Sequence, residues 1–89
     1  MNIVILQNGG FRRDYVGIYI DGTMWWQDND YGEEYVERLL KLLQMPGEKH
    51  VTVETVDDGV AEWMGLSKIY PDTLDEWRQV VTVVTTGRA

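Results

Sequence analysis

Carboxylates and large aromatic rings occur together in one stretch of this chain. Seven acidic residues lie between positions 14 and 37, and no lysine or arginine lies among them. Fixed negative charge attracts basic surfaces, and Trp and Tyr are among the side chains that most often anchor protein interfaces. This stretch therefore predicts a binder of something basic. The residues that we expect to contact the partner are Trp25, Trp26, Asp28, Asp30, Tyr31, Glu33, Glu34, Tyr35 and Glu37.

The same carboxylates could in principle hold a cation. Asp28 and Asp30 place oxygens at alternate positions, as a calcium loop does. That loop requires a third oxygen ligand where Gly32 stands and a glycine where Glu33 stands. Capping of a helix by Asp30 explains the same residues, so we expect no bound metal and no cofactor.

Other reactive side chains are few. His50 is the only histidine and Ser67 the only serine, and their spacing does not indicate a serine triad. The glycines at 9 and 10 precede two arginines, but the framework of a P-loop is missing. Carboxylate pairs for acid-base chemistry are available, yet a glycosidase also needs a deep cleft, which is hard to build from 89 residues. We therefore expect no enzyme.

The overall charge narrows the class of partner. Fifteen acidic residues against eight basic ones give a net charge of -7, which argues against direct contact with nucleic acid or anionic lipid. The absence of cysteine excludes disulfides and thiolate-bound metals and fits a reducing compartment. The apolar run Ile3 to Leu6 is too short for a signal peptide or a membrane span. We expect one cytoplasmic domain over residues 1–89.

The first third of the chain predicts three strands. Residues 2–7 are apolar and β-branched, and residues 15–20 and 23–27 are joined by Asp21 and Gly22. An Asp-Gly pair between such runs favours a type I′ hairpin turn, because glycine tolerates the positive φ that the turn requires.

Alternation along the predicted hairpin assigns its two faces. Val16, Ile18 and Ile20 share one face, and Tyr15, Gly17 and Tyr19 share the other. By the same rule Trp25 and Trp26 face opposite sides of the sheet. Only one of the two tryptophans can then enter a single-sided core.

Residues 30–44 predict an amphipathic helix. Asp30 and Glu33 have the spacing of a capping box, and Pro46 with Gly47 ends the helix. Glu34 and Glu37 stand four residues before Arg38 and Lys41, in the order that favours ion pairs. The apolar stripe consists of Val36, Leu39, Leu40 and Leu43, and Tyr35 and Leu42 flank it.

The second half is less regular. Residues 51–56 predict a strand, and Asp58 with Gly59 then turns a hairpin into 60–64, or an aspartate at 57 or 58 caps a short helix. Thr73 and Glu76 form a second capping box that opens a helical turn through Trp77 or slightly further. Residues 80–86 are almost wholly β-branched and predict a closing strand. The fold class is therefore α+β, with a mainly antiparallel sheet of about five strands and the helix 30–44 packed on one face.

These features indicate a non-enzymatic protein-binding module, monomeric or homodimeric, with no direct nucleic-acid or membrane contact. Its partner is a protein with a basic surface, such as a nucleic-acid-binding complex whose groove the acids and rings occupy as a nucleic-acid mimic. Small inhibitors that phages and mobile elements direct against nucleases and CRISPR complexes resemble this chain in being short, acidic and free of motifs. The alternative is a structural or adaptor module that binds through a sheet edge or an aromatic patch. A small metal-dependent hydrolase has the least support.

Overall fold

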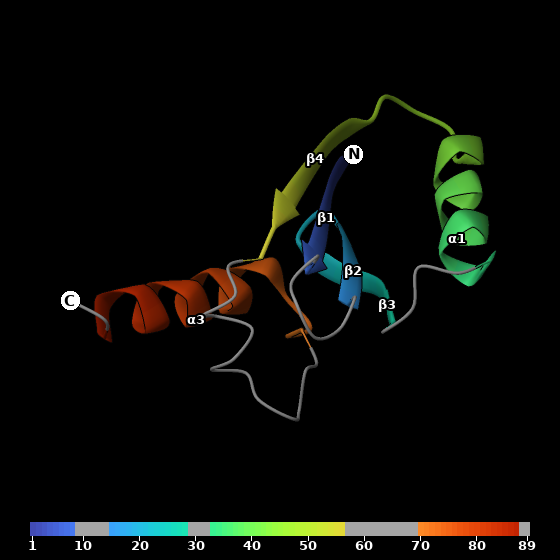
Figure 1. The fold of residues 1–89 in the computed structure, drawn as a ribbon. Helices are drawn as coiled ribbons and strands as arrows, with labels where there is room; N and C mark the ends of the chain where they lie inside the picture. Colours follow the sequence, from blue (N-terminus) through green and yellow to red (C-terminus); the bar gives the residue numbers. More distant parts are fainter. Residues whose placement is uncertain (9–14, 29–32, 57–69, 88–89) are drawn as a thin grey trace.

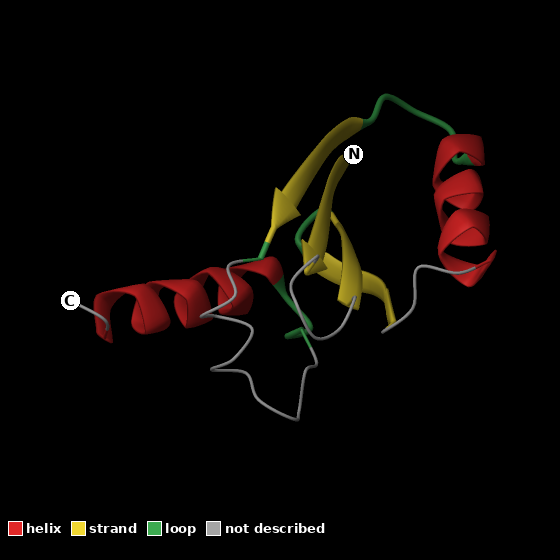
Figure 2. Cartoon of the chain, viewed as in Figure 1, coloured by secondary structure: helices red, strands yellow, loops and turns green. Residues whose placement is uncertain are grey.

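The protein is α+β, and its described residues form a mixed sheet between two helices. The structure, a computed structural model, describes residues 1–8, 15–28, 33–56 and 70–87. Within them four strands form one sheet in the order β3-β2-β1-β4, with α1 on one side and α3 on the other (Figures 1 and 2). The elements are β1 (Asn2–Asn8), β2 (Tyr15–Ile20), β3 (Thr23–Asp28), α1 (Glu33–Gln44), β4 (His50–Thr55) and α3 (Leu74–Gly87).

The hairpin predicted at Asp21 and Gly22 is confirmed. Their φ angles are 49° and 85°, the positive values of a type I′ turn, and β2 and β3 pair antiparallel on either side. The Asp21 carboxylate also accepts a hydrogen bond of 2.8 Å from the Asn2 backbone N–H. The turn is thereby fixed to the start of β1.

The sheet is mixed, whereas the sequence predicted about five mainly antiparallel strands. β1 pairs antiparallel with β2 but parallel with β4, and four strands lie within the described residues. Parallel strands need a crossover connection, and α1 provides it between β3 and β4. The second Asp-Gly pair, at 58 and 59, lies outside the described residues.

Both faces of the sheet are apolar because successive side chains on each strand alternate. On the α1 face, Ile3, Ile5, Val16 and Ile18 cluster with Leu42 of the helix. On the α3 face, Leu6 and Tyr19 cluster with residues that follow β4, namely Val56, Tyr70 and Trp77. The predicted division of β2 into two faces is confirmed, but a second helix covers the side that was expected to lie without one.

The strand predicted at 80–86 is wrong, because these residues belong to α3. The capping box does open the helix, since the Glu76 N–H donates to Thr73 Oγ1 at 3.2 Å. Trp77, Val80 and Val81 then recur at helical spacing and pack on the core of the α3 face. Burial of this stripe outweighs the preference of β-branched residues for strands.

The outer edge of β3 is covered by the segment that leads into α3. Met24 N–H donates to Asp72 O at 2.7 Å, and Leu74 N–H donates to Gly22 O at 2.8 Å. The Gln27 side chain completes this contact by accepting from Tyr70 N–H at 2.8 Å and donating to Tyr70 O at 3.2 Å. This segment therefore acts as a short extra partner for the hairpin.

Candidate partner-binding surface

A β-bulge brings both adjacent tryptophans to the α1 face. Ile18 pairs with Trp26 and Tyr19 pairs with Met24, so Trp25 is an extra residue in β3. Both Trp25 and Trp26 pack with the cluster on the α1 face, whereas Met24 packs on the α3 face. The prediction that the two indoles face opposite sides is therefore wrong, because alternation is interrupted at the bulge.

Trp26 and Tyr35 belong to the contact between sheet and helix. Their rings stack with centroids 6.0 Å apart and planes 7° apart, and Trp26 is only 9% exposed. The Trp26 indole N–H donates a long hydrogen bond of 3.4 Å to Glu34 Oε1. Burial raises the pKa of Tyr35. Trp26 thus anchors α1 and has little area left for a partner.

Trp25 is half-buried beneath a cation. The Arg38 guanidinium carbon lies 5.6 Å from the centre of the Trp25 ring, within the range of a cation–π contact. Arg38 also lies 3.9 Å from Glu34, which confirms the predicted ion pair at that spacing. Arg38 therefore neutralises Glu34 within the same helix and also covers the ring of Trp25, the more exposed of the two tryptophans.

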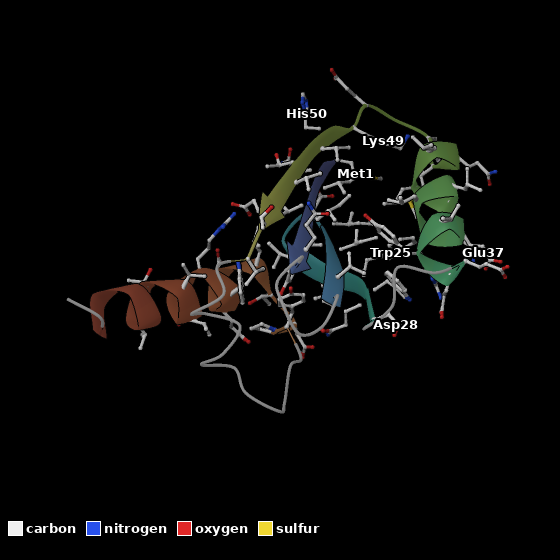
Figure 3. All side chains as sticks on the ribbon, in the orientation of Figure 1. Met1, Trp25, Asp28, Glu37, Lys49 and His50 are labelled. Carbon is white, nitrogen blue, oxygen red and sulfur yellow. The ribbon has the colours of Figure 1, made fainter. Side chains whose placement is uncertain are left out.

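The remaining predicted acids differ in their exposure to solvent. Glu33 and Glu37 are exposed, whereas Asp28 at the end of β3 is half-buried. Figure 3 shows Glu37 on the side of α1 that is remote from the strands and Trp25 between the sheet and the helix. Asp30 and Tyr31 lie outside the described residues, so the predicted cap at Asp30 does too.

Three large apolar side chains of α1 face away from the sheet. Val36, Leu40 and Leu43 are 52%, 52% and 72% exposed, although the sequence grouped them with Leu39 in one stripe. The residues that pack inward are Tyr35, Leu39 and Leu42. We call Glu33, Val36, Glu37, Leu40 and Leu43 the outer α1 surface. It combines two of the predicted acids with three residues that sequence reasoning did not place at a site.

The apolar part and the acidic part of this surface are contiguous. Residues three or four apart are neighbours on a helix, so Glu33 adjoins Val36 and Glu37, and Glu37 adjoins Leu40. Arg38 is directed to Trp25 and Glu34, and among the described residues the ion pair predicted between Glu37 and Lys41 is not formed. Apolar side chains bordered by carboxylates suit a partner that presents apolar residues bordered by lysine or arginine.

The described residues offer little for other chemistry. No group of three His, Asp or Glu side chains among them could hold a metal ion. His50 is exposed at the start of β4 (Figure 3), and Ser67 lies outside the described residues. No helix in the described part of the chain is long and apolar enough to cross a membrane.

Comparison of the chain with protein-family models, with curated proteins and with solved structures finds no match.

Proposed function

We propose that this chain is a non-enzymatic protein-binding module that docks on a basic protein through the outer α1 surface. The observation that carries the proposal is the exposure of Val36, Leu40 and Leu43 on one side of a single helix. Soluble proteins seldom leave contiguous apolar side chains uncovered, and such patches commonly mark interaction sites.

The apolar residues supply the affinity in this proposal. Val36, Leu40 and Leu43 stand at i, i+4 and i+7, so they form a row about two turns long. Full burial of one such side chain contributes about 1.5–3 kcal/mol. Because Val36, Leu40 and Leu43 are already partly buried, they gain only part of this amount, and apolar side chains of the partner must supply the rest of the free energy that offsets the entropic cost of association.

Glu33 and Glu37 supply the preference for a basic partner. Both carboxylates are exposed at the border of the row, and the chain carries a net charge of -7. Such charges act mainly on the association rate and on the choice of partner, and salt weakens their effect. Binding should therefore weaken as ionic strength rises.

The specific form that we propose is an inhibitor that occupies the nucleic-acid-binding groove of its target as a mimic. The acidic first turn of α1 and the overall negative charge support it, since lysine and arginine that bind phosphates also bind carboxylates. In this form, an oligonucleotide that binds the target would compete with the protein.

A second candidate function is an adaptor that binds through apolar contact alone, with acidity serving solubility. The row of exposed side chains on α1 favours it equally. The two functions differ in their salt dependence, because only charged contacts are screened. The adaptor would bind as tightly at high salt as at low salt.

Capture from a cell lysate with variants of the outer α1 surface tests the proposal. We expect Leu40→Ser and the double variant Glu33→Lys/Glu37→Lys to lose the same proteins that the wild type retains at low salt. Both changes are at exposed positions, so the fold should persist, and circular dichroism checks this. Retention of the same proteins by both variants would overturn the proposal.

A further inference from the structure

The two outer strands of the sheet, β3 and β4, differ in whether their outer edges are hydrogen-bonded. The edge of β3 is hydrogen-bonded to the segment before α3, as described above. Among the described residues no hydrogen bond covers the outer edge of β4, although five of its six residues are exposed. Proteins usually protect such an edge with proline, a bulge or an inward charge. The exposed edge of β4 instead carries Val51 and Val53.

The hydrogen bonds to β1 fix which groups of β4 point outward. His50 N–H donates to Met1 O at 2.9 Å, and Val56 N–H donates to Gln7 O at 2.8 Å. In a parallel ladder the residues that bond inward alternate with those that bond outward. Val51, Val53 and Thr55 therefore present their N–H and C=O groups to the open edge.

We propose that two copies of this chain pair antiparallel along β4, about a twofold axis at Thr52. In this register Val51 of one copy faces Val53 of the other, and each such pair exchanges two backbone hydrogen bonds through its outward groups. Thr52 then faces Thr52 of the second copy. An isologous contact of this kind is what a twofold dimer requires.

The side chains favour this register over its neighbours. With Thr52 on the axis, His50 lies opposite Glu54 of the second copy, so an imidazole N–H can donate to a carboxylate. The side chains of Val51 and of Val53 from the second copy lie next to each other on the α1 face of the sheet. A shift of the axis to Val53 would instead place Val51 opposite Thr55 and Glu54 opposite Thr52. Each of these pairs joins an apolar or charged residue to a threonine, so the Val-Val and His-Glu contacts would be lost.

α3 supplies a second contact. The helix begins at the β3 edge, where Thr73 pairs with Thr23, and reaches β4, where Arg78 bonds Glu54 at 2.7 Å. It then continues beyond the sheet, as Figure 1 shows. Val83, in the second half of this helix, is exposed. In the paired form this overhang lies over β4 of the second copy. The outer α1 surface takes no part in the pairing, so the proposal is independent of the proposed function.

Cysteine substitution tests the register directly, because the chain contains no cysteine of its own. Residues opposite each other without mutual backbone hydrogen bonds have Cα atoms about 4.5 Å apart, within the range of a disulfide. Thr52→Cys should therefore cross-link two copies under mild oxidation. Thr55→Cys is the matched control, since the two copies of that residue would lie about 20 Å apart along the strands.

Light scattering and an edge variant complete the experiment. We expect the wild type to show about twice the chain mass of 10.3 kDa. Val53→Pro removes an outward N–H but no bond to β1, so it should halve that mass while the circular dichroism spectrum persists. If that variant unfolds, the comparison of the two cysteine variants still decides. A mass of 10.3 kDa at every concentration, or equal cross-linking of Thr52→Cys and Thr55→Cys, would overturn the proposal.

Discussion

Gly17→Ala probes how closely the segment before α3 packs on β2. A Cβ atom at position 17 would lie 2.5 Å from Cδ2 and 3.1 Å from Cε2 of Tyr70. The ring has little room to move, because Tyr70 is buried and its backbone is bonded to Gln27. Overpacking of this kind costs about 1–3 kcal/mol. With about 4–8 °C for each kcal/mol in a domain of this size, a cost of about 2 kcal/mol lowers Tm by about 8–16 °C.

Thermal unfolding followed by circular dichroism measures this cost, and a second background identifies its cause. Tyr70→Leu removes the ring that the new methyl group would meet. Gly17→Ala should therefore cost at least about 1 kcal/mol less in the Tyr70→Leu background than in the wild type. An equal cost in both backgrounds would refute the steric explanation and leave a backbone effect.

Four further substitutions test the core and one ion pair. Tyr19→Phe removes a hydrogen bond of 2.7 Å to Pro71 O and should cost about 1 kcal/mol in urea unfolding. Because burial, chiefly, raises the pKa of Tyr19 in the folded state, wild-type stability should fall as pH rises above about 10, and less so in Tyr19→Phe. Trp26→Ala should cost about 3–5 kcal/mol and Trp25→Ala about 1 kcal/mol, so similar costs would contradict the roles given to the two rings. Arg78→Ala should cost no more than about 1 kcal/mol, because its pair with Glu54 is partly exposed to water; a larger loss on chemical unfolding would contradict this.

Turn preferences and side-chain alternation predicted correctly those features that depend on neighbouring residues alone. The turn at Asp21 and Gly22 is dictated by the positive φ that this dipeptide accepts, so the hairpin was predictable. The two faces of β2 follow from alternation alone. The end of α1 near Gly47, which has a φ of 101°, follows from the same kind of local preference.

Tertiary contacts decided the features that local rules missed. The β-branched residues of 80–86 are helical because Val80 and Val81 join Trp77 on the α3 face. Trp25 and Trp26 share a face because a bulge, which no residue signals in advance, shifts the register. The parallel position of β4 depends on where a crossover returns, and strand spacing along the chain does not specify this.

The candidate site was predictable only in part. The acids Glu33 and Glu37 belong to the run of carboxylates that contains no lysine or arginine, and the structure shows both of them exposed. Val36, Leu40 and Leu43 were recognisable as apolar, but α1 carries an apolar arc too wide for one sheet face to cover. Because Tyr35 stacks on Trp26, the side of the helix that carries Tyr35, Leu39 and Leu42 faces the sheet. The arc width was the signal that could have identified the outward residues.

The affinity of the captured partner for two matched charge variants tests the central claim most directly. Glu33→Lys/Glu37→Lys and Glu48→Lys/Asp72→Lys each replace two exposed acids with lysine, so both change the net charge equally. Titration calorimetry at low salt should show a loss of about tenfold or more for the first variant and little change for the second. Equal losses, or no loss for the first variant, would contradict docking through the outer α1 surface.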